Sequence, residues 1–299
     1  MGKVYLTACI GLDHDIVLLD QFCSHYKSLG IDPQNFLLVL NTSQRGKISE
    51  RIKEGMDILA QHGIEPMDIW CTRYESQEKW SRVHTLLNKV VTQKDWVVHP
   101  DTDEFHEIPT STYQELFKDF DSQGINAVQG ILIDRLAANC RVPVDIMAKN
   151  VFDEFPVCAD LSSLIKLAGV KLMAYRGFLR ANNGSGQVHE QLKSQAVYPH
   201  GKSLSYHETP EFIKWVGDPD YHSRSQEPED WTNLMPQIKS ELKYLVHHFK
   251  WHGRVIEKLK ERVETYTRLQ RAQVDQSIRI LDHYKNNGCF KLSQRENKT

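Results

Sequence analysis

The segment Asp95-Trp-Val-Val-His-Pro-Asp-Thr-Asp-Glu-Phe105 decides the fold, because it joins a short apolar run to three carboxylates. The run Trp96-Val-Val98 is typical of a buried strand, and Asp101, Asp103 and Glu104 follow it closely. Open α/β sheets bind ligands in the crevice outside the carboxyl ends of their strands. These acids are therefore expected at a ligand-binding edge of a sheet.

Two of the acids are spaced so that they could bind one metal ion. Side chains at i and i+2 of a strand point the same way, so Asp101 and Asp103 are expected to converge, with Glu104 on the opposite face as support. Carboxylates without a neighbouring Cys favour Mg²⁺ or Mn²⁺ over Zn²⁺, and such ions often bind substrate phosphates. Asp-x-Asp pairs are also common in solvated turns, but the apolar residues on both sides favour a site here.

The first half of the chain alternates strand-like and helix-like segments. Strands are expected at Val4–Ile10, Phe36–Leu40 and Met67–Cys71, before the acid-bearing strand. The helices between them are expected to present these apolar stripes: Ile16, Leu19, Cys23 and Tyr26, ending near Gly30; Ile48, Ile52, Met56 and Leu59, ending near Gly63; Trp80, His84, Leu87 and Val91. This order predicts an α/β fold with a mostly parallel, three-layer sheet and right-handed crossovers.

The second half is less regular. A helix is expected at Tyr113–Phe120 and a strand at Asn126–Ile133, followed by an irregular segment from Ala137 to about Gly169. A short strand at Tyr244–Trp251 and two terminal helices then restore a clear pattern. We expect residues 1–252 to form one catalytic domain and residues 253–299 to form C-terminal helices packed on it.

Composition narrows the class of protein. With 299 residues and 40% hydrophobic content, the chain is large enough to form its own core. A formal net charge of −2 without a Lys/Arg block disfavours a nucleic-acid partner. Six scattered cysteines are expected to be free thiols in a reducing compartment. No apolar run has the length of a membrane span or of a signal peptide core, so a cytoplasmic location is expected.

With these residues in place, the chain resembles glycosyltransferases of the GT-A fold, in particular family 2-like proteins with an Asp-x-Asp-Glu-Phe signature. Three blocks carry the resemblance, and the middle one is specific: Asp20–Asp32, Trp96–Phe105 and His247–Trp251. The resemblance implies a hexosyltransferase type of enzyme that moves a sugar from a nucleotide-sugar donor to a carbohydrate or other hydroxyl acceptor. It also implies Mn²⁺ or Mg²⁺ on the donor diphosphate, where the ion neutralises charge on the leaving nucleotide.

The resemblance further implies roles for individual residues. Asp103 is expected to bind the metal directly, and Asp101 to reach it through water or to hold the donor ribose. A His near the C-terminus often adds a ligand in such folds, and the matching residue is His248. Its neighbour His247 is expected to point to the other strand face.

Other site residues follow from their positions in the expected sheet. Thr7, Cys9 and Asn41 stand at the carboxyl ends of the first strands and are expected to line a nucleotide base pocket. Arg82 is expected to pair with the diphosphate. The Gly184–His189 loop is a candidate lid over the donor, with His189 reaching the phosphates.

An inverting reaction needs a general base to deprotonate the acceptor hydroxyl. Asp134, which follows a strand and precedes Arg135, is the first candidate for this catalytic role. Asp153, Glu154 and Asp160 are alternatives.

Three other functions stay open. A sugar-phosphate nucleotidyltransferase normally has a Gly-rich, basic loop after the first strand, and Ile10–Asp15 supplies one Gly and no Lys or Arg. A phosphohydrolase would need an Asp nucleophile at the end of that strand, where Asp13 and Asp15 stand nearby. A non-catalytic nucleotide-binding relative would have no need to keep clustered acids, which are costly to hold together.

Overall fold

The computed structural model describes residues 2–43, 50–143, 145–146, 150–165, 169–181, 187–199, 228–265 and 271–294. The chain divides into two compact units. Unit 1 comprises Met1–Gly130, Val170–Ser203 and Lys243–Val246, and unit 2 comprises Ile131–Gly169, Leu204–Leu242 and His247–Thr299. No segment of either unit begins or ends at residue 252, so the expected domain boundary there stays a prediction.

Unit 1 contains the expected parallel strands. Their order is β3-β2-β1-β4, and β8 is added antiparallel to β4. The bounds are β1 (Val4–Gly11), β2 (Phe36–Asn41), β3 (Asp68–Trp70), β4 (Trp96–Val98) and β8 (Val170–Arg176). Gly11, Asn41 and Trp70 lie in register and mark one carboxyl edge. Strands β1, β2 and β4 are almost wholly buried, which explains why they read as continuous apolar runs.

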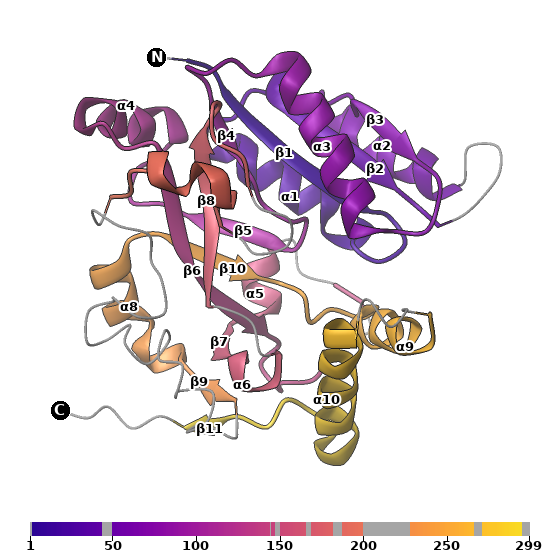
Figure 1. Ribbon diagram of the computed structural model, residues 1–299. Helices are drawn as coiled ribbons and strands as arrows, with labels where there is room; N and C mark the ends of the chain where they lie inside the picture. The colour runs from indigo at the N-terminus through magenta and orange to yellow at the C-terminus, as the bar shows by residue number, and fades with distance from the viewer. Residues whose placement is uncertain are drawn as a thin grey trace. The chain divides into compact units, whose positions relative to one another are not determined.

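Helices cover both faces of these strands (Figure 1). The four main helices of unit 1 are α1 (Ile16–Ser28), α2 (Glu50–Gln61), α3 (Ser76–Val90) and α4 (Tyr113–Gln123), and a short 3-10 turn, η1, covers Pro33–Asn35. Tyr5 and Cys9 of β1 pack in one cluster with Val83 and Leu87 of α3. Strand residues alternate between faces, so Leu6 and its even-numbered neighbours lie on the face opposite to that of Tyr5 and Cys9. The three-layer α/β expectation is confirmed in this unit.

Local sequence signals explain where these helices end. The C-terminus of α1 is followed by Gly30, which adopts a φ of 85° that residues with a side chain rarely reach. Helix α4 begins where the Thr112 hydroxyl accepts a hydrogen bond from the Glu115 amide at 3.3 Å, and it ends at Gly124 with a φ of 71°. The expected end of the first helix near Gly30 is confirmed, and α4 extends three residues beyond the expected Phe120.

The buried stripe of α2 differs from the expected one. Ile52 and Leu59 are buried as expected, but Met56 is 39% exposed and Gly55 lies on the buried side instead. A Cβ added at Gly55 would lie 2.8 Å from a methyl carbon of Leu12, so glycine permits a close approach there. Ile48 lies outside the described residues.

The chain after the acidic segment forms strands that the sequence pattern indicated only in part. Strand β5 (Glu104–Glu107) starts at the last of the three acids, and β10 (Leu245–His248) pairs with it. Strand β6 (Ala127–Leu136) is longer than expected and includes Asp134. A short 3-10 segment, η2, covers Glu190–Gln195.

Unit 2 contains structure that the sequence pattern did not predict. The segment expected to be irregular includes α5 (Val151–Glu154), β7 (Val157–Asp160) and α6 (Ser162–Ile165). Strand β7 pairs antiparallel with β6 and with β9 (Glu229–Asp230), which pairs parallel with β11 (Ser293–Gln294). The other elements of this unit are η3 (Thr232–Leu234), α8 (Met235–Leu242), α9 (Val255–Thr265) and α10 (Arg271–Asn287).

The C-terminal helices belong to the core of unit 2. Leu259 of α9 and Ile280 of α10 are fully buried in one cluster with Leu161, Trp251 and Phe290. Within the described ranges, no helix combines the length and the apolar character that crossing a bilayer requires.

Replacing Phe117 with Ala should lower the free energy of unfolding by about 3–5 kcal/mol, because the ring is fully buried and leaves a cavity. Phe117 stacks on Trp96 with ring centroids 4.1 Å apart. Met56→Ala, at the exposed position on α2, should change the free energy by only about 0.5 kcal/mol. Urea unfolding of both variants checks the prediction. Equal losses would contradict the assignment of the two side chains to core and surface.

Candidate functional site

The three acids lie on a tight turn at the end of β4. Thr102 and Asp103 form the turn, and Glu104 begins β5. The Glu104 amide donates to the Asp101 carbonyl at 3.0 Å, and the Asp101 amide donates to the Glu104 carboxylate at 2.9 Å. The expected alternation of the acids along a strand is therefore wrong, because a turn brings positions i and i+3 together rather than i and i+2. Asp101 and Glu104 are the acids that meet.

Two lysines contact the acid turn. Lys79 Nζ lies 2.5 Å from Asp101 Oδ1, and Lys171 Nζ lies 2.6 Å from Asp101 Oδ2. Lys171 also pairs with the carboxylate of Glu104, a side chain that is only 3% exposed. We call Lys79, Lys171, Asp101 and Glu104 the lysine–acid network. It brings two lysines together with two carboxylic side chains.

Strand register explains the position of Lys171. In the antiparallel pair of β4 and β8, Val98 opposes Ala174. Continuing this register three residues beyond Val98 reaches Asp101, directly opposite Lys171. Lys79 comes from the buried face of α3, next to Trp80 and one turn before Val83. The network is thus positioned by two regular elements.

Asp101, Lys79 and Lys171 are charged at neutral pH. Burial by itself would raise the pKa of Asp101, but Lys171 and Lys79 outweigh it and hold that pKa well below its usual range. Burial by itself would lower the pKa of each lysine, but Asp101 reverses the effect and raises both. Opposite charges at these distances stabilise one another strongly in a poorly solvated site.

His99 is a buried, neutral side chain close to the lysine–acid network. Burial, together with the positive charge of Lys79, lowers the pKa of His99 to about 3. The ring stacks on Trp80 with centroids 4.9 Å apart, and the His99 amide donates to the Met173 carbonyl at 2.9 Å. The imidazole therefore adds no positive charge beside the two lysines at neutral pH.

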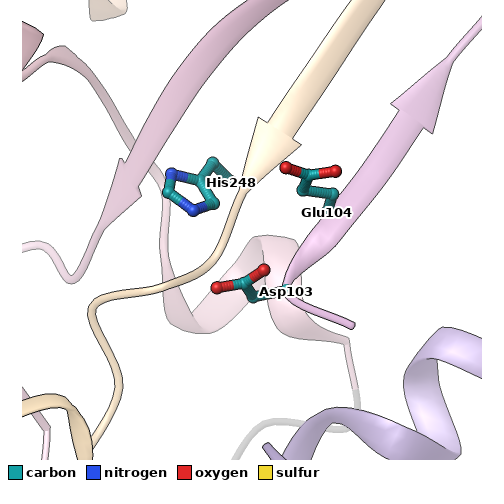
Figure 2. Close-up of side chains that lie close together, drawn as sticks. All are labelled: Asp103, Glu104 and His248. Carbon is teal, nitrogen blue, oxygen red and sulfur yellow. The ribbon is translucent and has the colours of Figure 1, made fainter. Parts of the chain in front are cut away.

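Asp103, Glu104 and His248 form the group, among the described residues, that could hold a metal ion, because each offers one ligand atom. Figure 2 shows Asp103 on the turn just before β5, Glu104 on β5 and His248 at the end of β10. Two carboxylates and an imidazole suit Mn²⁺, and they also occur around Zn²⁺. This group differs from the expected one, since it includes Glu104 and leaves Asp101 in the lysine–acid network.

Within unit 2, His248 is held by a buried carboxylate. Asp134 Oδ1 accepts hydrogen bonds from His248 Nδ1 at 2.9 Å and from Trp251 Nε1 at 2.8 Å. A carboxylate only accepts, so Nδ1 of His248 carries a proton in this contact. Asp134 is 3% exposed. In metal sites, a carboxylate that does not itself bind the metal commonly orients a metal-binding histidine in this way.

Asp134 and Arg135 do not form the pair that their adjacency in the sequence suggested. Neighbouring strand residues point to opposite faces, so Arg135 donates instead to the Pro156 carbonyl at 3.1 Å and contacts Cys158. Its guanidinium lies over the ring of Phe152. The expected role of Asp134 as a general base stays a prediction, although its burial and its two donors favour an orienting role.

The other candidate bases occupy different places in unit 2. Asp153 is exposed and Glu154 half-buried on α5. Asp160 lies at the end of β7, where its carboxylate accepts from the Ser162 amide at 2.8 Å and so caps the start of α6. A capping role accounts for Asp160, and nothing distinguishes the other two.

Of the residues expected to line a base pocket, Asn41 lies at the carboxyl edge of unit 1, but Thr7 lies in the middle of β1, opposite Leu37 near the start of β2. The expectation that Thr7 stands at the carboxyl end of its strand is therefore wrong. Thr7 is fully buried and donates to the Leu37 carbonyl at 3.3 Å. The side-chain amide of Asn41 donates through Nδ2 to the carbonyls of Trp70 at 3.0 Å and Thr72 at 2.9 Å, so it links β2 to the end of β3. These contacts give both side chains a structural role beside the expected one.

Cys9 should resist alkylation in the folded protein, because burial raises the pKa of its thiol to about 12. Cys71 is less buried and should react first. Iodoacetamide treatment at pH 8 followed by peptide mass mapping checks this order. Rapid labelling of Cys9 without denaturant would contradict the packing of β1 against α3, and both thiols should react in urea.

Arg82 and His189 lie in unit 1 with partners of their own. Arg82 pairs with Asp68 and Glu78, at 2.7 Å in each case, and lies over the Trp70 ring. The His189 amide donates to the Arg180 carbonyl at 2.7 Å. Residues 182–186 lie outside the described residues, so the expected lid falls there in part.

The two lysines were not predicted from the sequence, although each carries a signal. Lys79 occupies an apolar stripe of α3, where a surface lysine is not expected. Lys171 alternates with Met173 and Tyr175, both fully buried. A lysine on a buried face needs an acidic partner, and this signal could have indicated the network.

Comparisons with known proteins add little. No protein-family model matches the chain, and no curated protein is significantly similar to it. Solved structures of TarS from S. aureus align over 96% of this chain. The structure of residues 1–349 is 10% identical over 74% of its own chain, with a TM-score of 0.30. The complex with UDP-GlcNAc is 9% identical over 92% of its chain, with a TM-score of 0.31. These scores are too low to support an argument.

Proposed function

We propose that this protein is a metal-dependent glycosyltransferase that moves a sugar from a nucleotide-diphosphate sugar to a hydroxyl acceptor. The observation that carries the proposal is the acid turn after β4, which lies at the carboxyl edge of a parallel, helix-covered sheet. Ligands bind at this edge in open α/β sheets. The acidic signature on the turn is also the specific part of the resemblance to family 2-like GT-A enzymes, from which the hexosyltransferase type follows.

We assign the divalent ion, Mn²⁺ or Mg²⁺, to Asp103, Glu104 and His248. Chain connectivity supports the inclusion of His248, because it lies two residues beyond Val246 on β10, a strand that pairs with β5. A bound ion would neutralise negative charge on the leaving nucleotide diphosphate. Both carboxylate oxygens of Asp101 accept from lysines, so we do not assign Asp101 to the ion. Its expected alternative role, on the donor ribose, stays part of the proposal.

The protein groups have separate tasks in this proposal. Asp134 fixes the ring of His248 through Nδ1, so that Nε2 faces the ligand. Lys79 and Lys171 provide positive charge next to the site where the diphosphate would bind. Arg82 pairs with Asp68 and Glu78, neither of which belongs to the acid turn, so we assign it a smaller part in phosphate binding than its sequence position indicated.

The phosphohydrolase alternative is disfavoured by the contacts of Asp13. The Asp13 carboxylate accepts from the Thr42 hydroxyl and the Ser43 amide, both at 2.7 Å. Burial would raise the pKa of Asp13, but these hydrogen bonds outweigh it and lower the pKa. A carboxylate stabilised in this way is a weak nucleophile and serves to hold the loop after β1.

Donor hydrolysis tests the proposed function. Purified protein is incubated with UDP-, GDP- and dTDP-sugars, with Mn²⁺ or with EDTA, and release of the nucleoside diphosphate is measured. We expect one nucleotide class to be turned over in Mn²⁺ and not in EDTA. Release of pyrophosphate from a nucleoside triphosphate would instead support a nucleotidyltransferase. Failure of every nucleotide to react or to shift the melting temperature would refute the proposal.

A further inference from the structure

The lysine–acid network buries two charged lysines, which packing of a protein core does not require. Burying two lysines with two carboxylates has a large desolvation cost, and apolar side chains could fill the same space at lower cost. Lys171 occupies oxygens of Asp101 and Glu104, and Lys79 occupies the second oxygen of Asp101. Glu104 is also one of the three residues to which we assign the metal. A lysine and a cation therefore compete for the same carboxylates.

We propose that Lys79 and Lys171 act as built-in counter-cations that keep divalent metal affinity low until a nucleotide diphosphate is bound. This inference rests on the proposed function. Without ligand, the lysines neutralise Asp101 and Glu104, so the acid turn attracts a free cation weakly. A diphosphate supplies new negative charge, and the lysine ammonium groups pair with phosphate oxygens instead. The metal and the nucleotide then bind cooperatively.

The geometry supports coupling because one side chain reaches both acids. Lys171 contacts Asp101 and Glu104 together, so movement of one ammonium group changes the charge balance on two carboxylates. The ammonium is a compact charge on a flexible stem, which can change partners without moving β8. Lys79 is more deeply buried, with a side chain that is 9% exposed, against 20% for Lys171. Lys171 is therefore the lysine that we expect to exchange partners.

The test measures Mn²⁺ binding by electron paramagnetic resonance, with and without UDP, in the parent, Lys171→Met, Lys171→Arg and Lys27→Met. Lys171→Met should bind free Mn²⁺ at least about tenfold more tightly than the parent, because a nearby positive charge is removed. It should also gain less affinity from UDP than the parent does. Lys171→Arg keeps the charge and should resemble the parent. Lys27→Met removes a lysine that donates to the His62 carbonyl, away from the acid turn, and should also resemble the parent.

Two results distinguish failure of this inference from failure of the proposed function. If UDP raises the Mn²⁺ affinity of the parent but Lys171→Met binds free Mn²⁺ no more tightly, the counter-cation role is overturned. If UDP has no effect on the parent, the nucleotide-sugar function is in doubt, while the comparison in free Mn²⁺ still tests the lysine. Circular dichroism checks folding. If Lys171→Met is unfolded, Lys79→Met, which leaves Lys171 on Glu104, should show the same gain in affinity or overturn the inference.

Discussion

Replacing Asp103 with Asn should reduce kcat/KM for sugar transfer at least about 100-fold, while leaving the melting temperature nearly unchanged. The substitution keeps the size of the side chain but removes the negative charge that we assign to the metal, and groups that stabilise transition-state charge commonly contribute this much. Asp103 is half-buried on a turn, so its neutralisation does not open the core. Activity with saturating Mn²⁺ and the nucleotide that the parent prefers gives the measurement.

The matched control is Asp57→Asn, an equal change at an exposed position on α2. It should retain parental activity, so any shared loss would indicate an effect of preparation or of net charge. Mn²⁺ binding measured in parallel shows whether activity and metal affinity fall together. An Asp103→Asn variant with parental activity would remove Asp103 from the site.

The second large effect is expected at Asp134. Asp134→Asn should weaken Mn²⁺ binding about 10–100-fold, because the amide no longer fixes the His248 tautomer through a charged acceptor. Asp134→Ala should also lower the free energy of unfolding by about 1–3 kcal/mol for each buried N–H left without an acceptor. Those N–H groups belong to His248 and Trp251.

Three variants separate orientation from general base catalysis. If Asp134 is the base, Asp134→Asn should lower kcat and leave Mn²⁺ affinity unchanged. If it orients His248, Asp134→Asn and His248→Ala should both weaken Mn²⁺ binding, and the double variant should lose little more than either alone. Asp282→Asn, at an exposed position on α10, serves as the control in unit 2. Additive losses in the double variant would argue against a shared role.

Much of unit 1 could be predicted from the sequence, because its strands are buried on both faces and its helices are amphipathic. The continuous runs at β1, β2 and β4 and the stripes of α1 and α3 are strong local signals. Strand β8 was missed, since it follows an irregular segment and carries Lys171 and Arg176 among its apolar residues. In unit 2, α5, β7 and α6 are four residues long each, too short for periodicity to show.

The site was predicted in location more than in detail. The sequence placed the acids at a sheet edge and selected His248 over His247, and the structure includes His248 with Asp103 in the possible metal group. It could not show that a turn, rather than a strand, carries the acids, because closely spaced acids after an apolar run are compatible with either structure. Partners far apart in the chain, such as Lys171 with Asp101 or Asp134 with Trp251, depend on tertiary packing.

Anomalous diffraction from a crystal soaked with Mn²⁺ and a nucleoside diphosphate locates the ion and the nucleotide together. We expect one manganese peak within coordination distance of the Asp103 carboxylate, with the nucleotide diphosphate on the same ion and the base at the carboxyl edge of β1 and β2. A nucleotide bound away from the acid turn, or a manganese ion that contacts neither Asp103 nor phosphate, would refute the metal assignment.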